Sequence, residues 1–401
     1  MKTYTVLGLL VLGMLPMKSR GEELLVPTRG SEHIRVATFN TSFSKDESDG
    51  LIKELQRDSQ QAKRIAAVLR VVRPDIVLLN EFDYSPDKVA EKLFIEKYLA
   101  AQQGEIAGEP IEYPYRYSAE VNTGEPSGLD LDNNGKTDDP NDAWGFGKFP
   151  GHYGMLLLSK YPIREADVRS FRKFLWSELP GAKRPSDPTN GKSYYSDSVW
   201  KQLRLSSKSH WDVPIETPQG IIHLLCSHPT PPAFDGPENR NGNRNHDEIR
   251  LWKEYIENNN ASFLKDDAGK PGGLKEGSPF IIAGDLNADP VDGDDQGEAI
   301  KQLLNSPQIN SSMTPRADGG KESAQRQGKK NSEHKGDPAE DTSDFNDRNP
   351  GNLRVDYVLP STHFKIIQSG IFWPTFKQCM PIDPNWMSAS DHRLVWIDIS
   401  K

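Results

Sequence analysis

Short runs of apolar residues recur along most of the chain, each six or seven residues long and rich in branched side chains. They are IRVATF at 34–39, DIVLLN at 75–80, GMLLLS at 154–159, IIHLLCS at 221–227, PFIIAG at 279–284, RVDYVL at 354–359 and LVWIDI at 394–399. Runs of this length and composition are typical of core β-strands. We therefore expect a sheet-rich protein whose strands continue to the end of the sequence.

Helical spacing of apolar residues is clearest between the first two runs. In LIKELQRDSQQAKRIAAVLRVV, residues 51–72, the apolar positions share one side, charges occupy the other, and the pattern stops before Pro74. This predicts an amphipathic helix that covers a sheet. Shorter helices are expected near 87–101, 246–257 and 297–304, each too brief to form an independent helical domain.

The order of these elements favours an α/β sandwich in one domain, because strands outnumber helices and no internal repeat is visible. We place the domain at 31–400. Two insertions interrupt the pattern: 118–152 is rich in Gly, Asp and Asn, and 307–350 is polar and almost without apolar residues. We expect the second insertion to be a flexible surface segment.

The first residues, 1–21, have the pattern of a secretory signal peptide: a positive charge at Lys2, an apolar run at 4–15, and then Lys18 and Arg20. The run is too short to span a bilayer as a helix, so no stable membrane span is expected. We expect a secreted or periplasmic protein. The alternative is an uncleaved segment that anchors the protein at the membrane surface.

Composition narrows the class of protein only modestly. With 35% hydrophobic and 9% aromatic residues the chain is not a disordered one, and its net charge of -9 at pH 7 disfavours non-specific binding to DNA or anionic membranes. A local basic cleft is still compatible with this charge. Two cysteines, Cys226 and Cys379, form no disulfide framework, and whether they are bridged or are buried thiols stays open.

Polar side chains border most of the predicted strands. They are Asn40, Glu81, His228, Asp285, Asn287, Asp391 and His392. Each one alone is commonly a turn or helix-cap residue, and His228 before PTPP also suits a solvent-exposed proline turn. Oxygen donors without cysteine favour Mg²⁺ or Mn²⁺ over structural zinc. Such a cation beside two histidines and an Asp/Asn pair suits hydrolysis of phosphate esters.

The successive motifs of the chain resemble those of the endonuclease/exonuclease/phosphatase superfamily, which shares the fold of pancreatic-type deoxyribonuclease. They are RVATFN, DIVLLNEFD, YGMLLLSKYPI, LLCSHPTPP, IIAGDLNADP, RVDYVLPS and SASDHRLVWIDI, in family order from Ile34 to Ile399. The resemblance implies a four-layer α/β sandwich, in which two packed, mostly antiparallel or mixed β-sheets are flanked by helices. It also implies an exported phosphoesterase with its active site at one end of the sandwich.

The resemblance implies a metal site as well. Glu81 matches the principal metal ligand of the family, Asn40 matches a residue near the metal and the phosphate, and Asp391 matches the residue that completes the site. The expected cofactor is Mg²⁺ or Mn²⁺.

Catalytic roles are likewise implied by the matching positions. Asp285 and Asn287 correspond to the pair that orients or deprotonates the attacking water and holds the phosphate. His392, supported by Asp356, corresponds to a histidine that binds the scissile phosphate or acts as base. His228 corresponds to a histidine that protonates the leaving group or binds phosphate. Whether Asp285 or His392 is the base stays open.

Further candidates lie in the loops. Arg240, Arg244 and His246 follow the strand that carries His228, and an arginine fork there would bind a second phosphate, although a plain solvated loop has the same composition. DTSDF at 341–345 occupies the place where relatives line the substrate cleft.

The stretch GLDLDNNGKTDD at 128–139 resembles the first half of a calcium-binding loop. Its candidate ligands are Asp130, Asp132, Asn134 and Asp138. Position twelve is Asn141, and the flanks contain too much Gly and Pro for helices, so a helix-loop-helix sensor is not expected. A structural Ca²⁺ loop and a plain turn both stay open.

Two classes of function compete. The first is a metal-dependent phosphodiesterase or phosphomonoesterase acting on a small molecule, a lipid headgroup or a nucleic acid; a non-specific extracellular nuclease is one form of it, disfavoured by the acidic charge. The second is a catalytically silent binding or scaffold protein on the same fold. All the motif residues are present, which favours an enzyme. No protein partner is evident.

Overall fold

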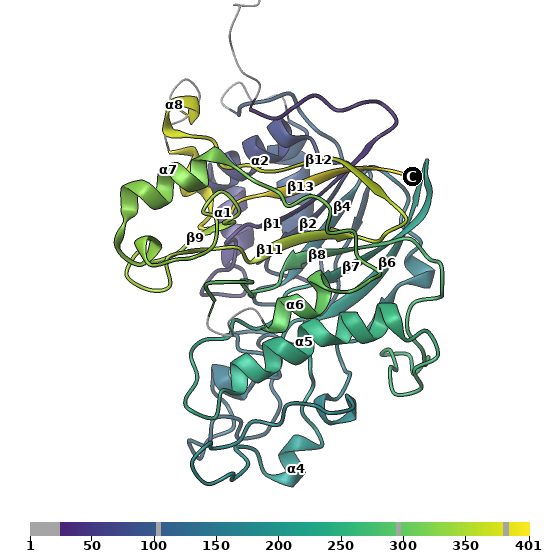
Figure 1. Ribbon diagram of the computed structural model, residues 1–401, viewed down its shortest axis with the longest axis vertical. Coiled ribbons are helices and arrows are strands. Elements are labelled where there is room, and N and C mark those ends of the chain that lie inside the picture. The colour runs from purple at the N-terminus through teal and green to yellow at the C-terminus, as the bar shows by residue number, and fades with distance from the viewer. Residues whose placement is uncertain (1–24, 102–105, 294–297, 380–384) are drawn as a thin grey trace, which may run out of the picture.

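The computed structural model describes residues 25–101, 106–293, 298–379 and 385–401. Two main sheets form its centre (Figure 1), with strand orders β12-β13-β1-β2-β4-β3 and β11-β8-β7-β6-β5. The first contains β1 (Ile34–Asn40), β2 (Ile76–Asn80), β3 (Tyr115–Tyr117), β4 (Met155–Ser159), β12 (Lys365–Ile371) and β13 (Val395–Ser400). The second contains β5 (Arg169–Ser170), β6 (His210–Thr217), β7 (Gly220–Ser227), β8 (Phe280–Asp285) and β11 (Asp356–Pro360). A small ribbon pairs β9 (Ser343–Asp344) with β10 (Asn352–Leu353).

Helices cover the outer faces of these sheets. The α-helices are α1 (Gly50–Gln56), α2 (Gln60–Val72), α3 (Val89–Leu93), α4 (Asp197–Trp200), α5 (Arg240–Glu257), α6 (Glu298–Leu304), α7 (Asp318–Gln327) and α8 (Phe376–Cys379). A π-helical stretch, η1 (Phe94–Leu99), continues α3. Short 3₁₀ turns are η2 (Pro140–Asp142), η3 (Glu165–Asp167), η4 (Trp176–Glu178), η5 (Lys329–Ser332) and η6 (Trp386–Ala389).

The alternation of side chains along the strands produces four layers. In β2, Val77 and Leu79 face the cluster that contains α2, whereas Ile76 and Leu78 face the space between the sheets. In β8, Ile282 packs with the apolar face of α5. Because each sheet is buried on both faces, its strands read as continuous apolar runs. The predicted sandwich of two mixed sheets flanked by helices is confirmed (Figure 1).

The seven predicted strands correspond to β1, β2, β4, β7, β8, β11 and β13. The longest strands that sequence patterning missed are β6 and β12. In β6, buried Trp211, Val213 and Ile215 alternate with other residues, and Pro214 lies among them. Proline within a run argues against a strand, so the alternation was not recognised.

The predicted helix at 51–72 is two helices, α1 and α2, and the prediction of one continuous helix is therefore wrong. Ser59 is the N-cap of α2, because its side chain accepts a hydrogen bond from the backbone N–H of Ala62. A new helix therefore starts after Ser59. Helix α5 begins at Arg240, earlier than the predicted start at 246.

The insertion at 307–350 has more regular structure than its composition predicts, since it contains α7, η5 and the β9–β10 ribbon. The expectation of a flexible segment is wrong in this respect. Its close packing comes from backbone: a Cβ on Gly319 would lie 2.1 Å from the carbonyl oxygen of Trp373, and one on Gly320 would lie 2.2 Å from that of Pro338. Such contacts leave no trace in hydropathy. The insertion at 118–152 is mostly irregular.

Cys226 and Cys379 are buried free thiols in this structure, and no bridge joins them. The predicted signal peptide at 1–21 lies outside the described residues. Among the helices that are described, none combines the length and the apolar character needed to cross a membrane.

Candidate active site

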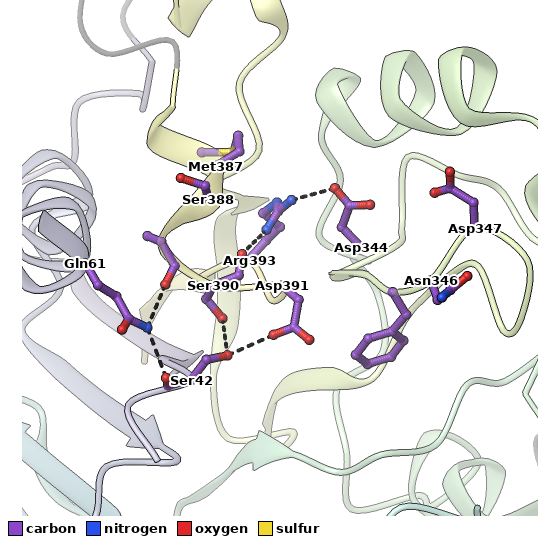
Figure 2. Close-up of a pocket in the computed structure, with 12 residues that line it drawn as sticks. Ser42, Gln61, Asp344, Asn346, Asp347, Met387, Ser388, Ser390, Asp391 and Arg393 are labelled. Carbon is purple, nitrogen blue, oxygen red and sulfur yellow. Dashed lines mark hydrogen bonds and ion pairs between the residues drawn. The ribbon is translucent and has the colours of Figure 1, made fainter. Parts of the chain in front are cut away.

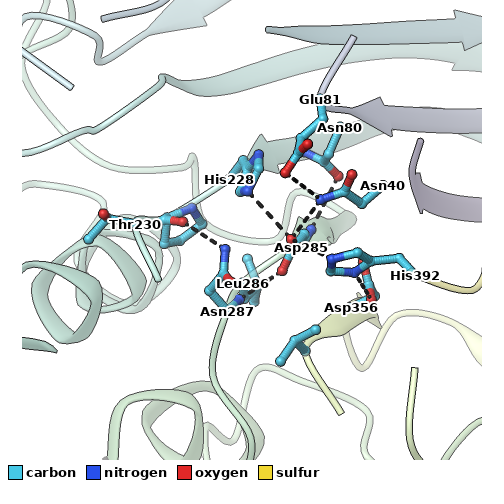
Figure 3. A network of polar contacts seen from close by, with 12 residues as sticks. Asn40, Asn80, Glu81, His228, Thr230, Asp285, Leu286, Asn287, Asp356 and His392 are labelled. Atoms are coloured by element: carbon cyan, nitrogen blue, oxygen red, sulfur yellow. Dashed lines mark hydrogen bonds and ion pairs between the residues drawn. The ribbon is translucent and has the colours of Figure 1, made fainter. Parts of the chain in front are cut away.

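Strand pairing brings the predicted site residues to one end of the sandwich. Asn40 and Asn80 lie side by side at the ends of the parallel strands β1 and β2, and Glu81 follows directly. In the second sheet, Asp285 at the end of β8 is opposite Asp356 at the start of β11. Figure 3 shows the resulting cluster, which draws on both sheets.

Asn40 links the two sheets at this end. Its Nδ2 donates to Glu81 Oε1 at 3.2 Å and to Asp285 Oδ2 at 3.0 Å (Figure 3). Ser44 Oγ donates to the other carboxylate oxygen of Glu81 at 3.0 Å. Burial raises the pKa of the Glu81 carboxyl. The cluster therefore contains two neighbouring carboxylates, one buried and one partly buried, that share one amide donor.

Two of the predicted residues have left-handed backbone conformations. The φ angle is 56° at Glu81 and 52° at Asn287, and each residue follows the end of a core strand. This conformation is unfavourable for residues other than glycine and is concentrated at functional sites. Around Asn287 it is fixed by hydrogen bonds from its N–H to Asp285 Oδ1 at 3.0 Å and from its Nδ2 to Pro229 O at 3.1 Å.

His392 is oriented by Asp356. Its Nδ1 lies 2.9 Å from Asp356 Oδ2, which also accepts a hydrogen bond from Thr342 Oγ1 at 2.8 Å. Its Nε2 is 3.7 Å from Asp285 Oδ2 (Figure 3). Burial alone would lower the pKa of His392, but the negative charges of Asp356 and then Asp285 raise this pKa to about 10. The imidazole is therefore a buried cation at neutral pH.

His228 lies on the other side of Asp285 and has the opposite preference. Its Nε2 is 3.4 Å from Asp285 Oδ2, and its Nδ1 has no hydrogen-bond partner among the described residues. Burial, followed by repulsion from Lys208 and His392, holds the pKa of His228 well below its usual value. Asp285 thus lies between a neutral and a cationic histidine.

The protonation of Asp285 is also set by its surroundings. Burial is the largest influence and raises its pKa to about 6, with Asp356 adding to the rise and His392 opposing it. A carboxylate whose pKa is near neutrality is well suited to accept a proton. Pairs of groups whose environments move their pKa values apart are typical of acid–base sites.

Glu81 and the side-chain oxygen of Asn40 fit a hard divalent cation, because Mg²⁺ and Mn²⁺ prefer such oxygen donors. Donor atoms of Asp285, Asp356 and His392 also lie within 4.8 Å of one another. The raised pKa of His392 keeps its ring protonated, and a protonated imidazole is no ligand. The chemistry of the donors therefore favours the Glu81 side of the cluster.

Asp391 lies at the margin of the cluster. Its Oδ1 accepts a hydrogen bond from Ser42 Oγ at 2.8 Å, and the N–H of Ser42 donates to Asn40 Oδ1 at 3.1 Å. Ser42 thus stands between Asp391 and the predicted metal ligands. The structure does not bring the Asp391 carboxylate into contact with Glu81 within the residues that it describes.

An open groove of about 760 Å³ begins beside Asp391 (Figure 2). Asp344 and Phe345, from the segment expected to line a cleft, form part of its wall, and Gln61 and Met387 lie across from them. The ring of Phe345 meets the ring of His392 edge to face, with 5.3 Å between centroids. The groove therefore borders the margin of the cluster at Ser42 and Asp391.

Comparison with known proteins gives the family. The model of the endonuclease/exonuclease/phosphatase family matches residues 37–392, which include every member of the cluster from Asn40 to His392. The chain belongs to this family. Members of the endonuclease/exonuclease/phosphatase family are hydrolases that act on phosphate esters.

Solved structures resemble the chain at low identity. An endonuclease/exonuclease/phosphatase from Beutenbergia cavernae has 17% identity and a TM-score of 0.49, with 92% of this chain and 71% of that one covered. A family protein from Leptotrichia buccalis has 12% identity and a TM-score of 0.48, with coverage of 92% and 100%. Sphingomyelinase C from Streptomyces griseocarneus has 15% identity and a TM-score of 0.44, with coverage of 91% and 99%. The search of curated proteins gave no match.

The predicted substrate-binding residues of the 240–246 segment are not brought to the family's cluster. Arg244 donates from Nε to Leu205 O at 2.9 Å and from Nη2 to Trp144 O at 2.6 Å. Arg240 pairs with Glu238, and His246 Nδ1 lies 3.0 Å from Asp247 Oδ1. Because α5 begins at Arg240, these residues lie on a helix that packs against the fold. In this structure Arg244 holds backbone in place, and its role in substrate binding stays a prediction.

The 128–139 loop is organised by its own hydrogen bonds. The backbone N–H of Asn134 donates to Asp130 Oδ1 and to Asp132 Oδ1, at 3.1 Å in both cases. Carboxylates of Asp130, Asp132 and Asp142 lie close enough to share an ion, whereas Asp138 is not in this group. Both the role of Asp138 as a ligand and calcium binding by the loop stay predictions.

Sequence patterning missed several residues that support the family's cluster. Asn80 Oδ1 accepts the N–H of Asp285 at 3.2 Å, and its Nδ2 donates to Ser227 O at 3.4 Å, so it joins the sheets beneath Asn40. On α5, Asn245 Nδ2 donates to Thr230 O at 2.8 Å and to Leu286 O at 3.0 Å. A polar residue at the end of an apolar run was the only available signal for Asn80.

Proposed function

We propose that the protein is an exported, metal-dependent phosphoesterase that hydrolyses phosphodiester or phosphomonoester bonds by in-line attack of an activated water. One observation carries this proposal: Asp285 lies between a neutral histidine, His228, and a cationic histidine, His392, within 3.4 and 3.7 Å respectively. This arrangement offers a proton acceptor and a positive charge to the same small volume.

In this proposal, Asp285 accepts the proton of the attacking water, because its raised pKa makes it a stronger base than an exposed carboxylate. His392, held by Asp356, binds a non-bridging oxygen of the phosphate through its Nε2–H. Asn287 keeps the Asp285 carboxylate in orientation through its backbone N–H. Neutral His228 borders the departing oxygen.

Glu81 and Asn40 would hold Mg²⁺ or Mn²⁺ in this proposal, and Asp391 remains the family's matching position beside Ser42. When bound, the ion neutralises phosphate oxygens and stabilises the leaving group. The shared hydrogen bonds of Asn40 keep the Glu81 and Asp285 carboxylates at a fixed separation.

The test is hydrolysis of bis-aryl phosphate, mono-aryl phosphate and plasmid DNA by the purified protein, with Mg²⁺, with Mn²⁺ and with chelator. We expect turnover of at least one ester, loss of turnover with chelator, and loss in both Asp285→Ala and His392→Ala. Asp167→Asn, at an exposed carboxylate on the surface, is the matched control and should keep full activity. If Asp285→Ala and His392→Ala hydrolyse the ester as fast as the wild type does, the assignment is wrong.

Export rests on the sequence of residues 1–21. Expression of the full chain followed by N-terminal sequencing of the extracellular or periplasmic fraction tests it. A processed N-terminus near residue 21 is expected. Recovery of only unprocessed protein with the membrane fraction would favour the surface anchor instead.

A further inference from the structure

Lys208 is a buried lysine at the same end of the sandwich as the cluster. Only 6% of its surface is exposed, and within the described residues its ammonium has no hydrogen bond or ion pair. It lies just before β6, whose first residue, His210, pairs with Ser227 of β7. Extending this antiparallel register places Ser209 opposite His228 and Lys208 opposite Pro229, the residue after His228.

The charges that act on Lys208 agree with a position near the cluster. Burial lowers its pKa, and the negative charges of Glu248, Glu81 and Asp285 oppose this effect. Its positive charge in turn depresses the pKa of His228. Lys208 therefore lies within electrostatic reach of carboxylates from both sheets, although it forms no direct ion pair with either.

The backbone around Lys208 is held from two sides. Glu248 of α5, which is fully buried, accepts the N–H of Ser207 at 2.6 Å through Oε1 and the N–H of Thr230 at 2.7 Å through Oε2. The carbonyl oxygen of Lys208 accepts the N–H of Asn122, from the 118–152 insertion, at 2.9 Å. One carboxylate thus fixes the chain next to Lys208 and the chain next to His228 in the same frame.

A nearly buried lysine without an ion pair among the described residues is unfavourable for the protein alone, because burial removes part of the hydration of its charge. Glu248 is the strongest of the carboxylates that attract it, and the other two, Glu81 and Asp285, are groups that the proposed reaction uses. A phosphate ester is the ligand whose charge matches this position. Lysine suits a single phosphate oxygen, since its ammonium is a compact point charge.

We propose that Lys208 binds a non-bridging oxygen of the substrate phosphate from the side of the second sheet. This inference rests on the proposed function and adds a substrate-binding residue to it. Together with His392, Lys208 gives the phosphate two cationic contacts supplied by the chain itself.

The test compares wild type with Lys208→Met, which keeps the length of the side chain and removes its charge, and with Lys208→Arg. In the presence of Mg²⁺, we expect Lys208→Met to lower kcat/KM about 100-fold and to raise the inhibition constant of orthophosphate at least about tenfold. Lys208→Arg should recover part of the phosphate affinity because it restores the charge. Lys160→Met is the matched control, since Lys160 is a half-buried lysine paired with Asp75 at the other end of the first sheet.

Calorimetric titration of the Mg²⁺-loaded proteins with orthophosphate gives the same comparison without turnover. A wild-type protein that hydrolyses no ester contradicts the proposed function, whereas an active Lys208→Met variant with wild-type phosphate affinity contradicts the role of Lys208 alone. A purely structural role would lower the melting temperature of Lys208→Met and leave phosphate affinity unchanged, which also overturns the inference. If Lys208→Met does not fold, Lys208→Gln replaces it, and wild-type phosphate affinity in Lys208→Gln overturns the inference.

Discussion

The two ends of the sandwich bury charge in different ways. At the end away from the cluster, Arg35 donates to both carboxylate oxygens of Asp398, at 2.7 and 2.8 Å, and its guanidinium lies 4.1 Å from the centre of the Trp396 ring. Asp75 there accepts from Arg29, from Lys160 and from the N–H of Arg35. These buried charges have opposite charges in direct contact.

At the Asp285 end, His392 pairs with Asp356 at 2.9 Å, but other buried polar groups lack such partners. Asp356 Oδ1 and His228 Nδ1 have no partner among the described residues, and Lys208 has no ion pair there. Burial raises the pKa of both Glu81 and Asp285. We infer that the paired end, with Arg35 and Asp398, stabilises the fold. The Asp285 end lowers the stability somewhat and keeps charged groups without protein partners, which a ligand can bind.

The largest expected effect comes from Asp285→Asn, at the Asp285 end of the sandwich. We expect kcat/KM to fall by about 10³-fold or more, since the amide cannot accept a proton, which corresponds to about 4 kcal/mol. The free energy of unfolding should stay equal or rise at pH 7, because the folded pKa of about 6 exceeds the unfolded one and burial of the carboxylate is unfavourable. Steady-state kinetics and urea unfolding measure the two. If Asp285→Asn is strongly destabilised but turns over substrate normally, the proposed difference between the two ends is wrong.

Asp398→Asn at the paired end should have the reverse profile. Breaking a buried ion pair from one side costs about 3–5 kcal/mol of unfolding free energy, because Arg35 keeps its charge without a carboxylate. At a temperature where the variant is folded, kcat should match that of wild type. The double variant Arg35→Met with Asp398→Leu should recover much of the loss. If Asp398→Asn is as stable as the wild type but inactive, the paired end does not have the purely stabilising role inferred for it.

Acid pH offers a further way to sharpen the comparison. His210 is fully buried near the catalytic end, with Nδ1 2.6 Å from Ser206 Oγ and Nε2 2.9 Å from Glu248 O, and burial lowers its pKa to about 3. The unfolded chain binds this proton below about pH 6.5, so the stability from neutral His210 is present above that pH and lost as pH falls.

By about pH 4 this single group should cost about 3 kcal/mol of unfolding free energy. His210→Asn should flatten the pH dependence of unfolding between about pH 4 and 6.5, while His363→Gln, at an exposed histidine, should leave it unchanged. Urea unfolding across this range is the measurement. An equally steep curve in His210→Asn would show that another group carries the acid sensitivity.

The smallest expected effect is stabilisation by Mg²⁺. At about 100 times its Kd, Mg²⁺ should add about 2.7 kcal/mol to the unfolding free energy of metal-stripped wild type. Glu81→Gln should lose this gain because it removes the proposed carboxylate ligand. Asp130→Asn, in the 128–139 loop, should keep it. If Glu81→Gln keeps the gain and Asp130→Asn loses it, the Mg²⁺ site is in the 128–139 loop and not at Glu81.

Local patterns carried most of the fold and part of the site. The apolar runs predicted the main strands, and the polar residues at their ends, such as Glu81 and Asp285, are those that the structure brings together. The resemblance to the family supplied the pairing of Asp356 with His392. Strand register across two sheets is non-local, so nothing near Lys208 in the sequence indicated that the charge of Glu81 would act on it.

Other features were hidden from the sequence analysis for a similar reason. Arg244 resembles a phosphate-binding residue by type, but the start of α5 at Arg240 turns it toward the carbonyl groups of Leu205 and Trp144. The 307–350 segment lacks apolar side chains, yet close backbone packing at Gly319 and Gly320 accounts for its regular structure. Hydropathy reports neither effect.

One face of α5 has a consequence for exchanging parts between relatives. Arg244, Asn245 and Glu248 bind the backbone of the 118–152 insertion, of the segment before β6 and of the loop after β7. These three surface segments are therefore not independent modules. A chimera that receives the insertion of another family member should need the buried face of that member's helix as well, whereas exposed positions of the insertion can diversify alone.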